Sequence, residues 1–332
     1  MNPSPLRYPG GKYKLYKYVS ELVKENKCTT YIEPFCGGAA IALELLFEGV
    51  VKDVIINDYD YTIFCFWNSI LHETEGFVQL ILDTPITMDE WHKQKAVRNE
   101  LDTHSSLEIG FSTFFLNRTN RSGIIDKAGP IGGLNQQGDY PIDCRFNKVR
   151  LISQIQKIAE YKDHIMIYNM EALDFIEDII LKKRKSFVFF DPPYYGKGPG
   201  LYTNFYSHGD HANLANTILQ RLKHRKWIVT YDNINAINQV LNYRDKLTKE
   251  YYALCHQSSK PFEVMSPKCV IIIGKISSMT TGEVSAFENF RNSLSNISIL
   301  TFDELYQRIM DLIAVLSNTP GVEKDSVEAL PF

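Results

Sequence analysis

Short apolar runs that alternate with amphipathic stretches limit most strongly what this chain can fold into. The runs are rich in β-branched and aromatic residues and are continuous rather than alternating, which is typical of strands buried on both faces. They lie at 30–35, 54–57, 165–168, 187–190, 227–230 and 270–273. Helix-like patterns follow three of them, at 39–46, 172–181 and 210–222. This alternation predicts an α/β fold with a parallel, doubly wound sheet.

Residues 61–160 interrupt the alternation. They include a stretch rich in Gly, Asn and Gln at 122–141 that has almost no periodicity. An insertion of this length is too long for a simple connection, so we expect a separate, mainly helical subdomain. The predicted organisation is one α/β domain from 1–60 and 161–276, the insertion, and a C-terminal extension at 277–332 whose role the sequence does not define.

The composition is that of an ordinary globular protein, with 44% apolar and 12% aromatic residues in a chain of 332. This composition excludes disordered, collagen-like and coiled-coil classes. The sequence has no run of 18 apolar residues and no N-terminal apolar stretch long enough for a signal peptide, so we expect a cytoplasmic protein without a membrane partner. The six cysteines include no C-x-x-C pair, so the sequence predicts neither a metal site nor a disulfide framework.

The net charge of −3 is distributed unevenly along the chain. Residues 280–332 hold eight acids and three bases, a balance of −5, which leaves the preceding part of the chain at +2. Within 112–150, six bases face three acids. This local excess of +3 is compatible with a solvated loop surface and with a contact to nucleic acid.

The strongest chemical signal is the sequence FVFFDPPYY at 187–195. Four apolar residues place Asp191 at the carboxyl end of a predicted central strand, where ligands of open α/β sheets bind. The Asp191 carboxylate and the Pro192 carbonyl can accept the two protons of an exocyclic amine such as that of adenine, which directs the nitrogen lone pair at an electrophile. Tyr194 can stack on the base. The alternative is a Pro-Pro turn with a capping Asp.

Two further turns follow predicted strands. In YIEPFCGGAAIALEL (31–45), the Gly37-Gly38 turn lets the backbone approach a ligand closely and directs helix amides at it, although a plain tight turn is equally compatible. In VIINDYD (54–60), Asp58 ends the second strand, where an acid can accept hydrogen bonds from both hydroxyls of a ribose. A helix N-cap is the alternative for Asp58.

A fourth motif, LRYPGGKYKL (6–15), precedes the core strands. Lys12 follows a Gly-Gly turn, so its ammonium can reach a carboxylate or a phosphate over the site. Its spacing is not that of a phosphate-binding loop, and a surface lysine is the alternative.

Taken in order and spacing, PGGK, EPFCGG, NDYD, the insertion and DPPYY resemble the Dam-like (D12 class) DNA adenine-N6 methyltransferases of the α group over most of residues 5–275. The resemblance implies a seven-stranded, Rossmann-like sheet, S-adenosylmethionine as cofactor, and a DNA-recognition role for the insertion. It implies a catalytic set of Asp191, Pro192, Pro193 and Tyr194. The cofactor-binding residues that it implies are Tyr8, Lys12, Phe35, Cys36, Gly37, Gly38, Asp58, Glu171, Ala172 and Asp191.

The family resemblance extends into FFLNRTNRSGI (114–124), where Asn117 and Arg118 match. Many members carry an aromatic residue, Asn and Gly where this chain has Arg121-Ser122-Gly123, so the recognised base sequence stays open. The residues that we expect to contact DNA are Asn117, Arg118, Arg121, Arg145 and Lys148.

The expected function is transfer of a methyl group from S-adenosylmethionine to N6 of an adenine flipped out of double-stranded DNA. The alternatives are the same chemistry on RNA or on a protein amide, and a non-catalytic DNA-binding or defence-complex subunit that keeps the fold. The sequence at 298–313 resembles the closing strand and helix of certain defence-nuclease chains. We therefore expect the extension to be an added structural element or the contact for a cognate restriction or defence protein.

Overall fold

The computed structural model describes residues 2–8, 10–194 and 206–231, together with three later strands. These strands are β6 (Tyr252–His256), β7 (Val270–Ile273) and β8 (Ile297–Thr301). The chain divides into two units, which are Met1–Pro193 with Lys197–Phe205, and Tyr194–Gly196 with Tyr206–Phe332.

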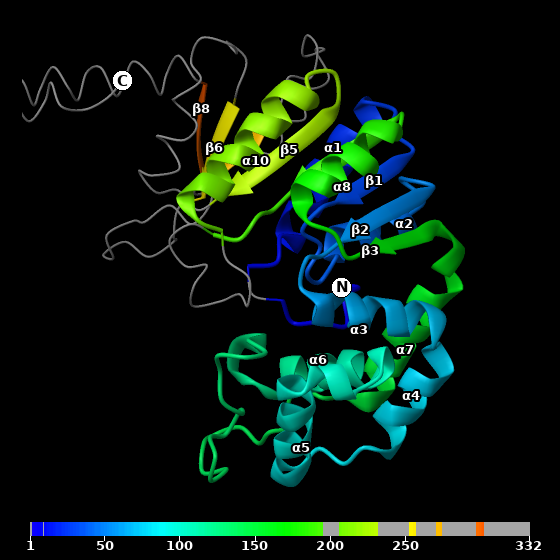
Figure 1. Ribbon diagram of the computed structural model, residues 1–332, viewed down its shortest axis with the longest axis vertical. Helices are drawn as coiled ribbons and strands as arrows, with labels where there is room; N and C mark the ends of the chain where they lie inside the picture. The colour runs from blue at the N-terminus through cyan, green and yellow to red at the C-terminus, as the bar shows by residue number, and fades with distance from the viewer. Residues whose placement is uncertain are drawn as a thin grey trace, which may run out of the picture. The chain divides into compact units, whose positions relative to one another are not determined.

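A parallel sheet forms the centre of the first unit (Figure 1). Its strands lie in the order β3, β2, β1, β4, and each pair of neighbours is parallel. Their bounds are β1 (Thr30–Glu33), β2 (Asp53–Asn57), β3 (Ile165–Tyr168) and β4 (Ser186–Phe190). All five residues of β4 are buried, which explains why the sequence of this strand is a continuous apolar run. The predicted α/β fold and these four predicted strands are confirmed.

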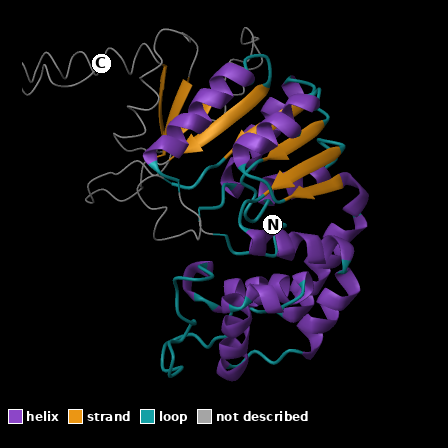
Figure 2. Cartoon of the chain, in the orientation of Figure 1, coloured by secondary structure: helices purple, strands orange, loops and turns teal. Residues whose placement is uncertain are grey.

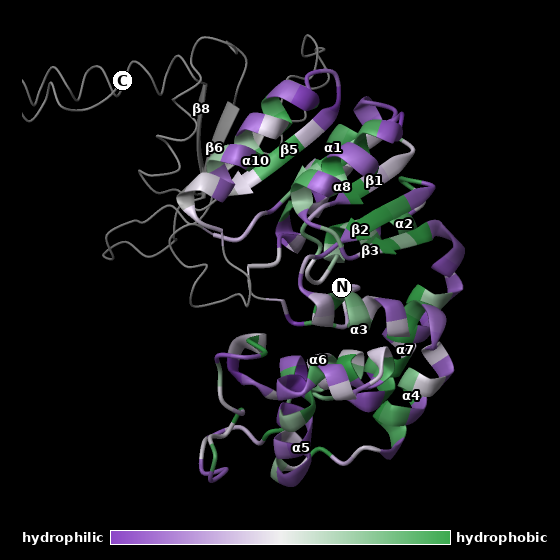
Figure 3. Cartoon of the chain, viewed as in Figure 1, coloured by the Kyte–Doolittle hydropathy of each residue, from purple (hydrophilic) through white to green (hydrophobic). Residues whose placement is uncertain are grey.

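Helices precede β1 and connect the later strands of this sheet. Their bounds are η1 (Tyr13–Leu15), α1 (Tyr16–Glu25), α2 (Ala40–Phe47), η4 (Lys162–His164), α8 (Ala172–Asp178) and η5 (Ile180–Lys182). Helix α1 buries Tyr18, Leu22 and Val23 on one side. Figure 3 shows hydrophobic residues along β2, in contrast to the mostly polar α5.

The insertion is helical, as its sequence predicts (Figure 2). Residues 61–160 are all described and contain no strand beyond the single bridge of Asn120 with Pro130. Helices α3 and α5 pack against α6, whose residues from Ile109 to Thr119 are all buried. The approach is close, because a Cβ on Gly110 would lie 2.7 Å from the carbonyl oxygen of Cys65. The helices are α3 (Tyr61–His72), α4 (Thr74–Asp83), α5 (Met88–Asn99), η2 (Leu101–Thr103), α6 (Ser106–Thr119), η3 (Arg121–Gly123) and α7 (Lys148–Glu160).

Side-chain amides organise the long loop between α6 and α7. The Asn120 side chain donates to the carbonyls of Ile124 and Ile125, at 2.9 and 2.8 Å, and accepts from the Trp91 indole at 2.7 Å. The Gln136 side chain bridges the loop in the same way further along, donating to the Ile131 carbonyl at 2.8 Å. The loop that lacks periodicity in the sequence is therefore held by its own Asn and Gln residues.

The second unit contains α10 (His208–Arg221), β5 (Lys226–Tyr231) and the three later strands. Strand β7 pairs antiparallel with both β5 and β6, and β8 pairs antiparallel with β6. The parallel sheet that the sequence predicts is therefore confirmed for β1 to β4, whereas β7 and β8 run antiparallel to their neighbours. A continuous apolar run indicates burial on both faces but carries no information about strand direction. The helices predicted beyond Gly274 lie outside the described residues.

Candidate functional site

The predicted turns of the first unit follow the carboxyl ends of adjacent parallel strands. The glycine turn follows β1, Asp58 follows β2, and Asp191 follows β4. Because the strands are parallel, these ends meet at one edge of the sheet, which is where ligands of such sheets bind. The fold therefore brings together side chains that lie far apart in the sequence.

The glycine turn after β1 is covered by the N-terminal segment. Gly37 has φ +43°, and a Cβ on it would lie 2.5 Å from the ring of Tyr8, so only glycine fits beneath that ring. The Trp67 indole donates to the Gly37 carbonyl at 2.9 Å and fixes the turn from within α3. Of the other residues predicted here, Cys36 and Gly38 are buried and Phe35 is partly exposed.

Asp58 is bound to the glycine turn. Its Oδ2 accepts a hydrogen bond from the Gly37 amide at 2.9 Å, and its Oδ1 accepts one from the Asp60 amide at 3.0 Å. The Cys36 thiol also lies 4.0 Å from Oδ2, Oδ1 retains a further lone pair, and the side chain is partly exposed. Burial, reinforced by the nearby Asp60 carboxylate, raises the pKa of Asp58 to about 7. Hydrogen bonds donated by the hydroxyl groups of a ligand would therefore stabilise the ionised form of this carboxylate.

Asn57, which the sequence analysis did not single out, ties three strand ends together. Its side-chain nitrogen donates to the carbonyls of Pro34 and Met170, at 2.9 and 3.1 Å, and its oxygen accepts from the Met170 amide at 2.9 Å. These partners follow β1 and β3, while Asn57 itself ends β2, and its side chain is fully buried. The only available signal was an amide side chain directly before Asp58 at the end of an apolar run.

Lys12 and Asp191 form an ion pair, with 2.8 Å between Nζ and Oδ2. The Lys12 ammonium also donates to the Gly10 carbonyl at 2.8 Å, so the Gly-Gly turn sets its direction. Pro192 is buried, whereas Asp191 and Pro193 are partly exposed. Tyr194 is also partly exposed and belongs to the second unit. The structure therefore brings together Lys12 and Asp191, two of the predicted site residues.

A further acid at this edge, Glu33, is almost fully buried at the end of β1. Burial raises the pKa of Glu33 to about 8, and the charge of Asp191 acts in the same direction. Sequence analysis passed over this residue within the EPF motif, although a Glu in an otherwise apolar strand is itself a signal of function. The two predicted residues after β3 are Glu171, which caps α8 by accepting from the Leu173 amide at 2.6 Å, and the buried Ala172.

These residues fit a ligand that carries hydroxyl groups such as those of a ribose. Asp58 offers acceptors for hydroxyl donors, and the Lys12 ammonium lies at the same edge of the sheet as Glu33, whose raised pKa leaves its carboxyl mostly protonated at neutral pH. Among the described residues, no group of three or more His, Cys, Asp and Glu side chains is arranged to hold a metal ion.

The residues predicted to contact DNA differ in their burial and in their hydrogen-bond partners. Asn117 is fully buried: its oxygen accepts from the Arg7 amide at 2.7 Å, and its nitrogen donates to the Gly123 carbonyl at 2.8 Å. Lys148 donates to the carbonyls of Leu82 and Thr84, both at 2.8 Å, and so caps the end of α4. The side-chain oxygen and nitrogen of Asn117 are thus engaged within the chain, whereas the Lys148 ammonium uses two of its three N–H donors there and is partly exposed.

Three arginines of the predicted set are differently placed. Arg121 and Arg145 are exposed, and neither forms an ion pair within the described part of the chain. Arg118 is buried on α6. Unlike the buried Arg98, it has no acidic partner among the described residues.

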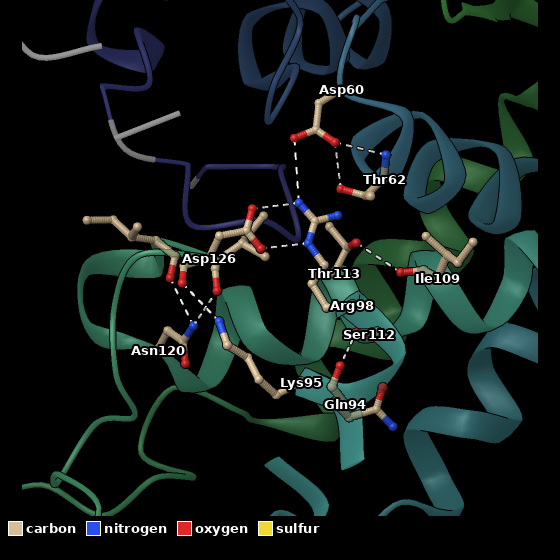
Figure 4. Close-up of polar contacts among 12 residues, drawn as sticks. Asp60, Thr62, Gln94, Lys95, Arg98, Ile109, Ser112, Thr113, Asn120 and Asp126 are labelled. Carbon is tan, nitrogen blue, oxygen red and sulfur yellow. Dashed lines mark hydrogen bonds and ion pairs between the residues drawn. The ribbon is translucent and has the colours of Figure 1, made fainter. Parts of the chain in front are cut away.

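Arg98 links the insertion to the loop that carries Asp58 (Figure 4). From α5 its guanidinium donates to both oxygens of Asp126, at 2.7 and 2.8 Å, and lies 3.7 Å from Asp60. Burial alone would lower the pKa of Arg98, but the bonds to Asp126 and the charge of Asp60 outweigh it and the pKa rises. Asp60 also caps α3 through Thr62. Arg98 thus joins the 121–130 loop to the start of the insertion.

The comparisons with known proteins agree with this geometry. The family model for the D12 class N6 adenine-specific DNA methyltransferases matches residues 8–254. The chain therefore belongs to this methyltransferase family. A second family model, that of the C-terminal part of Shedu protein SduA, matches residues 214–306 and overlaps the first.

Individual relatives show the same two likenesses. Type II methyltransferase M.MjaIII of Methanocaldococcus jannaschii is 23% identical over 57% of this chain and 68% of its own length. Modification methylase StsI of Streptococcus sanguinis is 26% identical over 58% of this chain and 28% of its own length. Shedu protein SduA of Bacillus cereus is 34% identical over 26% of this chain and 24% of its own length. The chain thus spans only about a quarter of SduA and of StsI. Within the described residues, no helix is both long and apolar enough to cross a bilayer.

Proposed function

We propose that this chain transfers a methyl group from S-adenosylmethionine to N6 of an adenine flipped out of double-stranded DNA. The observation that carries the proposal is Asp191 of the DPPY motif, paired with Lys12 at the carboxyl edge that also carries the glycine turn and Asp58. Membership of the D12 class supports the choice of base and atom. M.MjaIII and StsI, by their names a methyltransferase and a modification methylase, support the choice of reaction.

The residues of the chain would act by binding and orientation. S-adenosylmethionine, when bound, supplies an electrophilic methyl group. Asp58 accepts the ribose hydroxyls, and the Tyr8 ring and the Gly37 turn close the pocket beside it. The Asp191 carboxylate and the Pro192 carbonyl accept the two N6 protons, so the nitrogen lone pair is turned toward the methyl carbon. Tyr194 stacks on the extruded base.

The reaction then balances without a strong base. As the bond from N6 to the methyl carbon forms, the bond from that carbon to sulfur breaks and its electron pair stays on sulfur. The nitrogen becomes cationic and loses one proton, which the Asp191 carboxylate can receive and pass to water. The catalytic gain lies mostly in holding nitrogen, carbon and sulfur in line.

A methylation assay tests the proposal. The purified chain is incubated with S-adenosylmethionine and unmodified genomic DNA, and N6-methyladenine is measured by mass spectrometry of the nucleosides. We expect methylation by the wild type, near-complete loss in Asp191→Ala, and weakened donor binding in Asp58→Ala. The matched control is Asp178→Ala, which removes an exposed acid at the end of α8 and should leave the rate unchanged. Methylation of RNA alone would overturn the choice of substrate.

A second role rests on the likeness of residues 214–306 to Shedu protein SduA. This segment runs from the methyltransferase match into the C-terminal extension, so we propose that the extension contacts a cognate restriction or defence protein. This second role is compatible with the alternative that the chain is a non-catalytic DNA-binding or defence-complex subunit. Sequence-specific DNA binding by a folded wild type that never turns over S-adenosylmethionine would favour it over the enzyme.

A further inference from the structure

Arg118 carries a buried charge that the described part of the chain does not neutralise. The residue is 9% exposed, and its Nε atom has no hydrogen-bond partner. None of the hydrogen bonds and ion pairs among the described residues involves its guanidinium. Withdrawing an arginine from water without a partner is strongly unfavourable, so folds rarely retain such a charge unless it has a function.

The neighbouring helix shows how this fold treats a structural arginine. Arg98 on α5 is 8% exposed, close to the value for Arg118, yet Asp126 engages it through two hydrogen bonds and Asp60 lies beside it (Figure 4). Two arginines of equal burial on packed helices therefore have opposite surroundings. The difference is the anion, which Arg98 receives from the chain and Arg118 does not.

More positive charge surrounds Arg118. Burial lowers the pKa of Arg118 to about 9, and the charges of Arg7 and Arg150 contribute to this shift. Burial and the charge of Arg145 likewise lower the pKa of Arg7, opposed only by the thiol of Cys144. The guanidinium groups of these four arginines carry like charges, so they repel one another in the free protein.

Contacts around the end of α6 hold Arg7 close to Arg118. The Asn117 side chain binds the amide and the carbonyl of Arg7, at 2.7 and 3.2 Å, next to Arg118 on α6. The Arg7 guanidinium donates to the Asn120 carbonyl at the end of α6, at 3.3 Å. Gly123 has φ +74°, and a Cβ there would lie 2.1 Å from the Arg7 carbonyl oxygen. The close packing of these segments thus fixes two like charges, those of Arg7 and Arg118, near one another.

We propose that Arg7, Arg118, Arg145 and Arg150 form a binding site for a phosphate of the DNA backbone. The proposal rests on the proposed function and names Arg7 and Arg150 as contacts that the sequence motifs did not indicate. Guanidinium groups bind phosphate through two parallel hydrogen bonds, and the single negative charge of a phosphodiester would supply the anion that Arg118 lacks in the free protein. Exposure is graded from the buried Arg118 through the partly exposed Arg7 to the exposed Arg145 and Arg150, so the site opens to solvent on one side.

The position suits a phosphate close to the reacting nucleotide. Arg7 precedes Lys12 by five residues, and Lys12 contacts Asp191. The same N-terminal segment therefore reaches both the arginine cluster and the carboxylate of the DPPY motif. A phosphate held by the cluster would position the strand whose base enters the site.

The first test measures stability and needs neither DNA nor methyl transfer. Arg118→Met keeps an unbranched chain of similar length and removes the charge. In phosphate-free buffer we expect its melting temperature to exceed that of the wild type by about 3 °C or more, because an uncompensated charge is lost. Inorganic phosphate, compared with chloride at equal ionic strength, should raise the melting temperature of the wild type and not that of Arg118→Met. The control is Arg184→Met, an exposed arginine in the connection before β4.

The second test measures DNA binding against salt concentration. A lost phosphate contact lowers the slope of log affinity against log salt by about one unit for all duplexes alike. We expect this change in Arg118→Met and in the exposed variants Arg145→Met and Arg150→Met, with at least a tenfold loss of affinity for Arg118→Met. Arg184→Met should keep the wild-type slope. The exposed variants keep the test decisive if Arg118→Met folds poorly.

The outcomes separate the two proposals. Unchanged slopes and affinities in all three variants of an active methyltransferase would overturn the phosphate site and leave the proposed function standing. Stabilisation of the wild type by phosphate through Arg118, in a chain that binds no DNA, would support the anion site and overturn both its assignment to DNA and the proposed function.

Discussion

The ammonium of Lys12 lies 2.8 Å from the carboxylate of Asp191, although 179 residues separate them in the sequence. Their side chains are only 10% and 21% exposed, so the pair is partly withdrawn from water. The N-terminal segment therefore supplies the counter-charge for the acid at the centre of the proposed chemistry. The strength of this pair is a measurable property of the fold.

Replacing Lys12 with Gln should destabilise the fold. The half-buried Asp191 would lose its charged partner, at a cost of about 1 to 3 kcal/mol of unfolding free energy. Urea denaturation of Lys12→Gln, Asp191→Asn and the double variant gives the coupling, which we expect to exceed about 0.5 kcal/mol, as is usual for residues in contact. The control is the exposed pair of Lys182 with Asp178, where Lys182→Gln should cost less than about 0.5 kcal/mol. Additive effects at Lys12 and Asp191 would contradict the prediction.

Donor binding should strengthen as the pH rises through 7. The ionised Asp58 accepts ribose hydroxyls better than the protonated acid, and its pKa is about 7. Affinity for S-adenosylmethionine should therefore rise roughly tenfold from pH 6 to pH 8, with proton release on binding. Calorimetry in buffers of different ionisation enthalpy measures both.

The matched variant is Asp58→Asn, which should bind weakly and without this pH dependence. The raised pKa also has a consequence for the free chain. Folding disfavours the ionised acid, so this destabilisation is present above pH 7 and fades as the pH falls toward the unfolded value of about 3.9. A wild-type affinity that stays flat between pH 6 and pH 8 would assign the ribose to another group.

Removing the Asn57 side chain should loosen three strand ends at once. Asn57→Ala leaves two carbonyls and one amide without their partner in a buried setting, and we expect a loss of about 3 kcal/mol of unfolding free energy. Donor affinity should fall with it. Asn169→Ala is the comparison, because Asn169 also donates to two carbonyls near Asp58 but is exposed, and should cost less than half as much. Equal losses in chemical denaturation would refute the role of Asn57.

Ser122 adopts a left-handed backbone conformation that is less costly for Asn or Gly than for Ser. Its φ of 57° lies in the left-handed region, which Asn tolerates at lower cost than most residues. The side chain is exposed, so Ser122→Asn should raise the free energy of unfolding by about 0.5 to 1 kcal/mol. Thermal denaturation of the two proteins measures the difference, and a destabilised Asn variant would show that Ser122 contributes something other than its backbone.

A methyl group at Gly123 should detach the N-terminal segment from the insertion. Gly123→Ala combines an unfavourable φ of +74° with a Cβ 2.1 Å from the Arg7 carbonyl oxygen. Gly49→Ala is a matched control, because Gly49 has φ +66° and nothing within 4 Å of the added Cβ. The control should cost about 1 kcal/mol and Gly123→Ala clearly more. Equal costs would mean that the Arg7 segment moves aside without loss.

The first unit of the fold and the turns of the site were predictable because their signals are local. An apolar run before Asp58 or Asp191 marks the end of a strand, and parallel strands then bring those ends together. The antiparallel direction of β7 and β8 was not predictable, because apolar runs do not encode direction. Asn57 was missed because its role depends on loops after two other strands.

Charge counting does not show which bases of the insertion already have partners within the chain. It made Lys148 a candidate DNA contact, and the fold gives its ammonium two carbonyl partners at the end of α4. Arg98, outside the counted range of 112–150, could not be distinguished from Arg118 by sequence either, because the acids that compensate Arg98 lie far from it in the sequence, on either side. Burial and partners, which decide the role of a charged side chain, are properties of the fold rather than of local sequence.

The contact of Arg7 with Asn117 also sets an order for folding. Their hydrogen bonds span 110 residues, and those of Gln154 with the carbonyls of Asn2 and Pro3 span about 150. The segment around Arg7 is synthesised before the insertion, so it has no docking site until the helices of the insertion have been made and packed. Hydrogen exchange during refolding should show the sheet and insertion protected before residues 4–8. A chain arrested at that stage would have a native core, but the Tyr8 ring would not cover the glycine turn.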